Sequence, residues 1–171
     1  MISLSYHPCF DAFHGIFRII RLFQGLQTTY MEVDKYRILD YYLLFPWRAA
    51  DVRLARPDVS LRAIAKALDK KKDYATLPEG AVLLERMRPS QQAALQTMAN
   101  DGAIDTDALF QGVAKLTERI IPQNLHDLAK KKNEENAAVI GIVSALARYP
   151  VLGIEGLKAR TSLLEHRYDN V

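Results

Sequence analysis

Large apolar residues recur at helical spacing along most of this chain, and prolines, glycines and capping residues separate the periodic segments. Near the N-terminus the large apolar residues are Phe10, Phe13, Ile16, Phe17, Ile20 and Phe23. This spacing places them on one face of a helix. Another face carries most of the polar residues, Asp11, His14, Arg18 and Arg21. We therefore expect the helix to pack against a core or a partner protein. A second helix is expected over residues 32–45, because Pro46 disfavours the helical conformation of the residue before it.

A basic helix is expected next, after an irregular connection over residues 48–57. Ser60 is a suitable N-cap for residues 61–68, whose positions 61, 64, 65 and 68 form one apolar stripe. The opposite face carries Arg62, Lys66 and Lys70. Lys71 and Lys72 extend the positive charge beyond the end of the helix.

The following segment has an order of elements that is typical of half a winged helix. A short helix over residues 78–87 should end before Pro89, and Ser90 should cap a second helix over residues 91–100. Gly102 should stop that helix, because glycine readily adopts the left-handed conformation. Residues 103–105 then predict a small strand, and Thr106 should cap a helix that continues through Glu118. A helix-turn-helix joint of any all-helical protein has the same form.

The C-terminal part predicts one long helix over residues 124–147 and a short helical tail over residues 154–167. No internal repeat or long linker divides the chain, so residues 1–171 should form a single domain. Its parts are an N-terminal helical pair (1–47), a winged-helix-like region (48–121), and the long helix with its tail (122–171). The expected fold class is mainly α, a compact multi-helix domain that is winged-helix-like with at most a small β-hairpin.

Composition excludes several classes of protein. The chain has 23 Lys and Arg against 20 Asp and Glu, so the placement of charge matters more than its net value of +3. Cys9 is the one cysteine, which excludes an internal disulfide and fits a reducing cytoplasm. Residues 136–147 are the longest charge-free part of the apolar C-terminal stretch and are too short to span a membrane. Asp11 and two histidines interrupt the apolar N-terminal stretch, so we expect no secretion signal and a cytoplasmic protein without membrane contact.

No residue pattern points clearly to catalysis or to a cofactor. No glycine-rich loop precedes a Lys-Ser or Lys-Thr pair, so the chain has no P-loop. His7, Cys9 and His14 are the only clustered soft ligands, and a structural zinc site needs four. A thiol nucleophile at Cys9 would need His14 as its base, about one and a half turns away on a helix. We therefore expect no catalytic, cofactor-binding or metal-binding residues.

Two candidate surfaces remain. We call the first the basic strip, which contains Arg53, Arg56, Arg62, Lys66, Lys70, Lys71 and Lys72. Such residues can neutralise DNA phosphates without reading sequence or can meet an acidic partner protein, and a solvated helix face has the same composition. The second is the aromatic cluster, which contains Tyr36, Tyr41, Tyr42, Phe45 and Trp47. Aromatic residues dominate both protein interfaces and cores, so Tyr41, Tyr42, Phe45 and Trp47 are interface candidates and also core candidates.

The N-terminal third resembles a known family. The residues that carry the resemblance are 6–14, with the sequence YHPCFDAFH, 18–22, with RIIRL, and 32–46, with EVDKYRILDYYLLFP. They are similar to middle components of bacterial ABC three-component systems, the group that includes Lamassu-type antiphage defence. The resemblance implies a small helical, winged-helix-like subunit without enzymatic activity. In that family the subunit sits between an SMC-like ABC ATPase and an effector such as a nuclease.

The leading hypothesis from the sequence is a non-catalytic adaptor that bridges an SMC-like ATPase to a nuclease-type effector. Its basic strip would contact double-stranded DNA non-specifically or an acidic protein surface. The alternative is a stand-alone winged-helix DNA-binding protein, such as a transcription regulator, with the helix after Ser60 or the helix after Ser90 in the major groove. A third hypothesis, an enzyme, requires His7, Cys9 and His14 to converge on a pocket.

Overall fold

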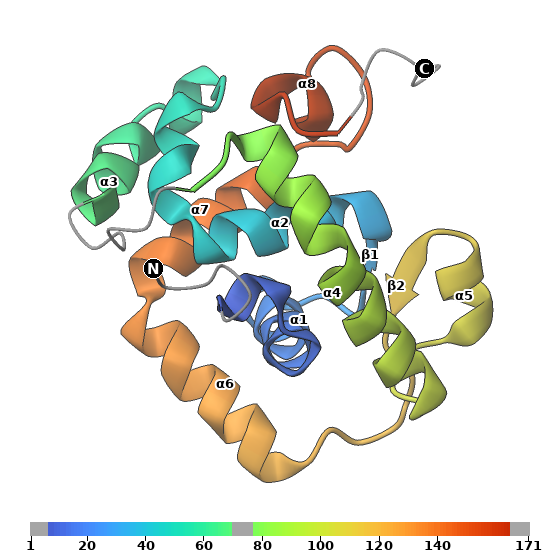
Figure 1. Cartoon of the computed structure of the whole chain (residues 1–171). Helices are drawn as coiled ribbons and strands as arrows, with labels where there is room; N and C mark the ends of the chain where they lie inside the picture. The colour runs from blue at the N-terminus through green and yellow to red at the C-terminus, as the bar shows by residue number, and fades with distance from the viewer. Residues whose placement is uncertain (1–6, 70–76, 165–171) are drawn as a thin grey trace.

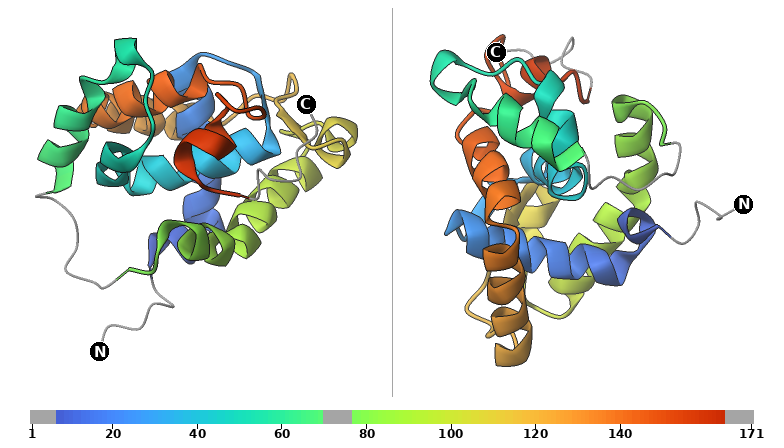
Figure 2. Two further views of the ribbon diagram at one scale, coloured as in Figure 1. Left: turned by 90° about the horizontal axis from the view of Figure 1, so that it is seen from above. Right: turned by 90° about the vertical axis from the view of Figure 1, so that its left-hand side faces the viewer.

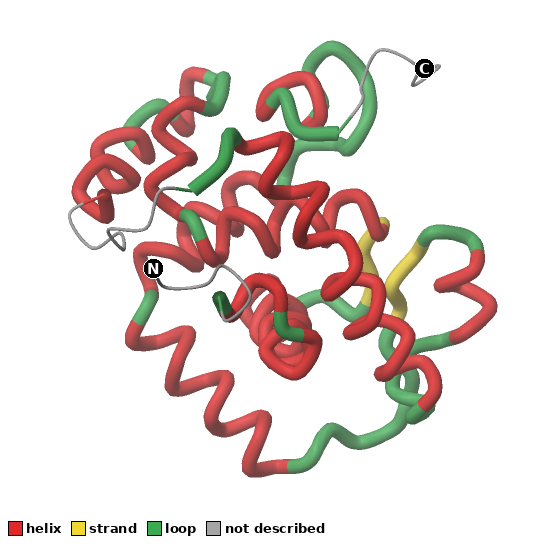
Figure 3. The backbone as a smooth tube through the Cα atoms, in the orientation of Figure 1, coloured by secondary structure: helices red, strands yellow, loops and turns green. Residues whose placement is uncertain are grey.

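The computed structural model describes residues 7–69 and 77–164 (Figure 1). Helices and two short strands follow one another as η2 (Pro8–Phe10), α1 (Ala12–Leu26), β1 (Tyr30–Glu32), α2 (Val33–Leu44), η3 (Pro46–Asp51), η4 (Arg56–Asp58), α3 (Leu61–Leu68), α4 (Gly80–Asn100), α5 (Thr106–Phe110), β2 (Val113–Lys115), α6 (Gln123–Glu135), α7 (Ala137–Ala147) and α8 (Leu157–Thr161). The expected mainly helical class is confirmed, since the strands form only a small antiparallel sheet (Figure 3). None of the described helices combines the length and the hydropathy that a transmembrane span needs.

Helix α1 lies between α4 and α6 and is seen nearly end-on in Figure 1. Figure 2 shows that α6 crosses α1 steeply, while α7 continues upward along α2. The fully buried residues come from all of these helices, and they include Ile19 and Leu22 of α1, Ile38 and Leu39 of α2, Leu83, Leu84 and Met87 of α4, and Ile142 of α7. The core is therefore continuous through the described part of the chain.

Local capping explains the ends of α1. The Asp11 carboxylate accepts hydrogen bonds from the backbone N–H groups of Phe13 (2.7 Å) and His14 (3.2 Å), which satisfies two free donors of the first turn. At the other end Gln27 adopts the left-handed conformation with φ 50°. Helices α2 and α3 occupy the predicted segments within one or two residues.

Helix α4 corrects the prediction of two shorter helices separated at Pro89. It runs through Pro89 without a break, although proline removes one backbone donor from a helix interior. Core residues occur on both sides of Pro89, and their packing offsets this loss. Ser90 is not a cap, because it is buried inside α4 and its hydroxyl donates toward the carbonyl oxygens of Cys9 and Met87 at 2.8 Å each. Ser60 also forms no capping bond, and its backbone is helical.

The sheet joins segments that are far apart in the sequence. β1 pairs with β2 in antiparallel register, with Met31 opposite Ala114, so a long connection and not a hairpin turn joins the two strands. Of the predicted strand 103–105, only Ile104 forms an isolated bridge, to Leu116. The predicted helix 106–118 ends at Phe110, before Gly112 with φ +80°, and Asp105 rather than Thr106 caps it by accepting from the Ala108 N–H at 2.8 Å.

The predicted long helix 124–147 is two helices, α6 and α7, that meet at Asn136. The backbone of Asn136 leaves the helical region (φ −112°, ψ 38°), and its side chain donates to the Lys132 carbonyl at 2.8 Å. Such a bond competes with the backbone helix ladder. The break lets α6 pack on α1 while α7 packs on α2. The predicted tail helix 154–167 is reduced to α8 within the described residues.

Candidate interaction surfaces

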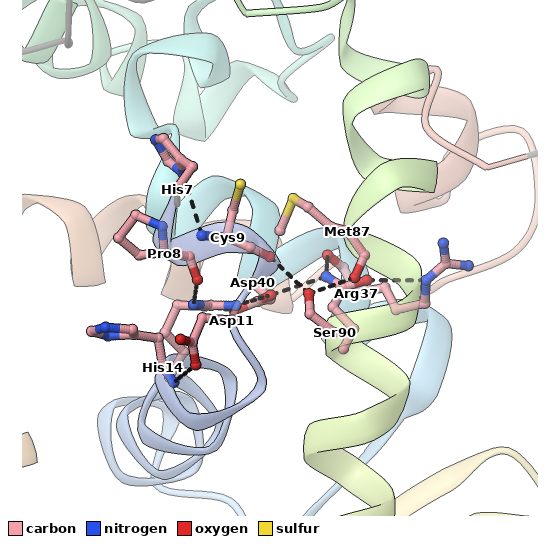
Figure 4. Close-up of polar contacts among 11 residues, drawn as sticks. His7, Pro8, Cys9, Asp11, His14, Arg37, Asp40, Met87 and Ser90 are labelled. Atoms are coloured by element: carbon pink, nitrogen blue, oxygen red, sulfur yellow. Dashed lines mark hydrogen bonds and ion pairs between the residues drawn. The ribbon is translucent and has the colours of Figure 1, made fainter. Parts of the chain in front are cut away.

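A buried polar network joins α1, α2 and α4 near the N-terminal turn (Figure 4). Arg18 Nε donates to Asp40 Oδ1 at 2.5 Å, and its Nη1 donates to the Pro8 carbonyl oxygen at 2.9 Å. Gln91 Nε2 donates to Asp40 Oδ2 at 3.0 Å. Burial acts to lower the pKa of Arg18, but the charge of Asp40 and the hydrogen bond to it outweigh burial, so the pKa is raised. The Asp40 carboxylate of α2 thus links α1 and α4 to its own helix through hydrogen bonds.

The expectation that Arg18 and Arg21 lie on a polar face of α1 is wrong. Arg18 is 4% exposed and Arg21 is 9% exposed. Arg21 Nε donates to Asn133 Oδ1 of α6 at 2.9 Å, and burial together with the nearby Arg18 lowers its pKa. Each of these two charges meets a polar side chain from another helix, so neither charge is on a free face.

The network reaches the surface through Arg37 of α2. Its Nε donates to Gln91 Oε1 at 3.2 Å, and its Nη2 donates to Glu85 Oε1 at 2.9 Å. Gln91 returns a bond from Nε2 to the Arg37 carbonyl oxygen at 3.2 Å. These polar groups therefore join α2 to α4 through hydrogen bonds.

His7, Cys9 and His14 do not form a joint site. Cys9 is fully buried, and burial raises the pKa of its thiol to about 12. His7 accepts the Cys9 backbone N–H on Nδ1 at 3.3 Å and stacks on Phe45, whereas the exposed His14 points away from the sulfur in Figure 4. No group of three or more His, Cys, Asp or Glu residues in the described part of the chain is arranged to hold a metal ion.

The described members of the basic strip are all exposed: Arg53, Arg56, Arg62 and Lys66. Arg62 and Lys66 lie one turn apart on α3, and Ala65, between them in the sequence, is fully buried. Arg53 donates to the Ile154 carbonyl oxygen at 2.5 Å, and Arg62 donates to the Val52 carbonyl oxygen at 3.3 Å. Two residues of the basic strip, Arg62 and Lys66, therefore lie on α3. Lys70, Lys71 and Lys72 lie outside the described residues.

The aromatic cluster packs mainly into the core. Tyr41, Tyr42 and Phe45 are 2%, 3% and 1% exposed, whereas Trp47 is partly buried. Neighbouring ring centroids lie 5.1 Å apart for Tyr41 and Tyr42 and 5.7 Å apart for Phe45 and Trp47, both in edge-to-face geometry. Core packing accounts for these contacts. An interface role for the four residues stays a prediction.

The structure reveals an apolar surface that the sequence reasoning missed. Phe110, at the end of α5, is 94% exposed. It lines a groove of about 520 Å³ between α4 and α5, together with Val33, Gln92, Ala93, Leu95, Gln96, Leu109 and Gly112. None of these groove residues carries a charge. The signal in the sequence was Gly112, which ends the helix early and leaves Phe110 at a turn.

The chain matches a known protein family. The family model described as "ABC-three component (ABC-3C) system Middle Component 5" matches residues 4–169. No match was found among curated proteins or among solved structures.

Proposed function

Because the chain belongs to the middle component 5 family of ABC three-component systems, we propose that it is a non-catalytic adaptor in an antiphage defence complex. The adaptor would bridge an SMC-like ABC ATPase to an effector such as a nuclease, as in Lamassu-type systems, and would act in the cytoplasm. The observation that carries the proposal is the family match over nearly the whole chain. A middle component works with the other components of its system.

The described residues support an adaptor better than an enzyme. The only thiol is buried with a raised pKa, and the two nearby histidines do not face it. The groove beside Phe110 offers an uncharged surface with an exposed aromatic ring, which is the type of residue that anchors protein interfaces. We infer that this groove receives a partner subunit.

The test is co-expression with the products of the neighbouring genes. We expect the full chain to co-purify with an ABC ATPase at a fixed stoichiometry through affinity capture and size exclusion. Recovery of the chain as a monomer, with the ATPase expressed and folded in the same cells, would contradict the proposal. Turnover of a substrate by the purified chain alone would contradict the non-catalytic role.

A stand-alone DNA-binding protein is the second candidate, because the exposed basic residues of α3 could contact phosphates. That alternative expects sequence-selective binding by this chain alone at physiological salt. In the adaptor, we expect only weak, non-sequence-specific binding of double-stranded DNA, with an affinity that falls steeply as salt rises. Competition between specific and random duplexes distinguishes the two.

A further inference from the structure

A polar pocket of about 440 Å³ lies where the end of α2, η3, the start of α4 and the end of α8 meet. Its walls include Tyr42, Arg48, Asp51, Glu79 and Leu163. It is distinct from the groove beside Phe110, with which it shares no residue. Two observations indicate a specific ligand for this pocket.

The first observation is the hydroxyl of Tyr42. The Tyr42 residue is only 3% exposed, and its hydroxyl forms no hydrogen bond with the described residues. Among the described side chains, the Tyr36 hydroxyl is the one fully buried polar atom without a partner, so the Tyr42 hydroxyl keeps some solvent-accessible area. Tyr42 is also one of the residues that line the pocket. Tyr41 differs, because its hydroxyl accepts from Arg48 Nη1 at 2.8 Å.

The second observation is the balance of charge. Asp51 and Glu79 line the pocket, and neither forms an ion pair within the described residues. Arg48 is held against the wall, since its Nη2 donates to the Pro78 carbonyl oxygen at 2.9 Å and its guanidinium lies 5.7 Å from the centre of the Phe45 ring. With two carboxylates and one guanidinium, the described residues of the lining have a formal charge of −1. A cation is therefore favoured over an anion.

We propose that this pocket binds the ammonium group of a lysine side chain displayed by a partner subunit, with Asp51, Glu79 and the Tyr42 hydroxyl as its acceptors. A lysine ammonium has three donors, which matches three separate acceptors better than the flat guanidinium of arginine does. For the partner subunit, this pocket is a second contact site in addition to the groove beside Phe110. The proposal rests on the proposed adaptor function for the identity of the partner, but binding of the ammonium group can be measured alone.

The first experiment titrates Nα-acetyl-lysine-N-methylamide into the full chain carrying ¹³C-labelled tyrosine and follows the Tyr42 ring signals by NMR. The signals should shift saturably, and the norleucine analogue, which lacks the ammonium group, should not shift them. The exposed carboxylates allow a neutral double variant, Asp51→Asn with Glu79→Gln, that should weaken binding about five- to ten-fold. The matched control, Asp107→Asn with Glu118→Gln, removes the same charge away from the pocket and should leave binding unchanged.

The second experiment repeats the co-purification with both double variants. Loss of ATPase or effector from the pocket variant alone supports the proposal, and equal recovery with both variants overturns it while the adaptor function stands. If the wild-type chain captures no partner, the proposed adaptor function is wrong. A saturable shift of the Tyr42 signals would then show that the pocket binds a free amine instead. A norleucine response equal to that of lysine overturns the pocket chemistry in either case.

Discussion

The Tyr36 hydroxyl lies inside the core of the protein with no hydrogen-bond partner among the described residues. A buried hydroxyl without a partner costs about 1–3 kcal/mol. We therefore expect Tyr36→Phe to raise the free energy of unfolding by about 1 kcal/mol in urea denaturation. Tyr41→Phe is the control, because it removes a hydroxyl that does accept a bond from Arg48, and it should lower stability. A destabilised Tyr36→Phe protein would mean that this hydroxyl has a partner after all.

The buried thiol of Cys9 and the buried hydroxyls of Tyr36 and Tyr42 make the stability of the fold depend on pH. Burial raises the pKa of each of these groups, to about 12 for Cys9. Above pH about 9 the unfolded chain releases protons from these groups, whereas the folded state keeps them. The contribution of the three groups to stability is therefore complete below that pH and is lost as the pH rises further. Urea midpoints measured between pH 7.5 and 10.5 should fall above pH 9. The fall should be shallower in Tyr36→Phe, and an identical slope would contradict the assignment.

At the scale of elements, the contact between α1 and α4 depends on Gly15. A Cβ atom at this position would lie 2.9 Å from the Cβ of Ala94, which cannot move aside without shifting its helix. Gly15→Ala should therefore lower the free energy of unfolding by about 1–3 kcal/mol, despite the better helix propensity of alanine. Thermal and urea unfolding provide the measurement.

Two further variants separate this steric effect from helix propensity. Gly141 of α7 has no atom within 4 Å of the position of a Cβ, so Gly141→Ala should be neutral or stabilising by about 0.5–1 kcal/mol. Adding Ala94→Gly to Gly15→Ala restores the space and should recover part of the loss. Equal effects of alanine at both glycines would exclude the contact as the cause.

Helices α2 and α3 were predictable from the sequence, although Ser60 does not cap α3 as expected. Periodic apolar residues and Pro46 placed α2, and the stripe at residues 61–68 placed α3. The continuity of α4 through Pro89 was not predictable, because packing on both sides outweighs a local breaking signal. The same applies to Arg18, whose partner Asp40 lies 22 residues away on another helix. The short sheet joins residues about 80 positions apart and has no local signal.

At the scale of the whole molecule, the basic strip and the Phe110 groove differ in how far the sequence reveals them. The exposed face of α3 follows from the spacing of Arg62 and Lys66 along one helix. The groove requires α5 to lie beside α4, which the pairing of β1 with β2 and the early end of α5 determine. Its neutral lining becomes visible only once these elements are assembled.

Because Phe110 is exposed, its contribution to partner binding can be measured separately from its contribution to folding stability. The side chain is 94% exposed, so Phe110→Ser should change the free energy of unfolding by less than about 0.5 kcal/mol. If the ring anchors a partner in the groove, its loss should weaken the complex by about 2 kcal/mol, roughly thirty-fold, in a titration with the ATPase or effector subunit. Phe13→Ser is the matched control, because Phe13 is 81% exposed on α1 and does not line the groove. Equal weakening by both variants would mean that general loss of surface hydrophobicity, and not docking in this groove, reduces association. An unchanged affinity for Phe110→Ser would place the adaptor contact elsewhere on the molecule.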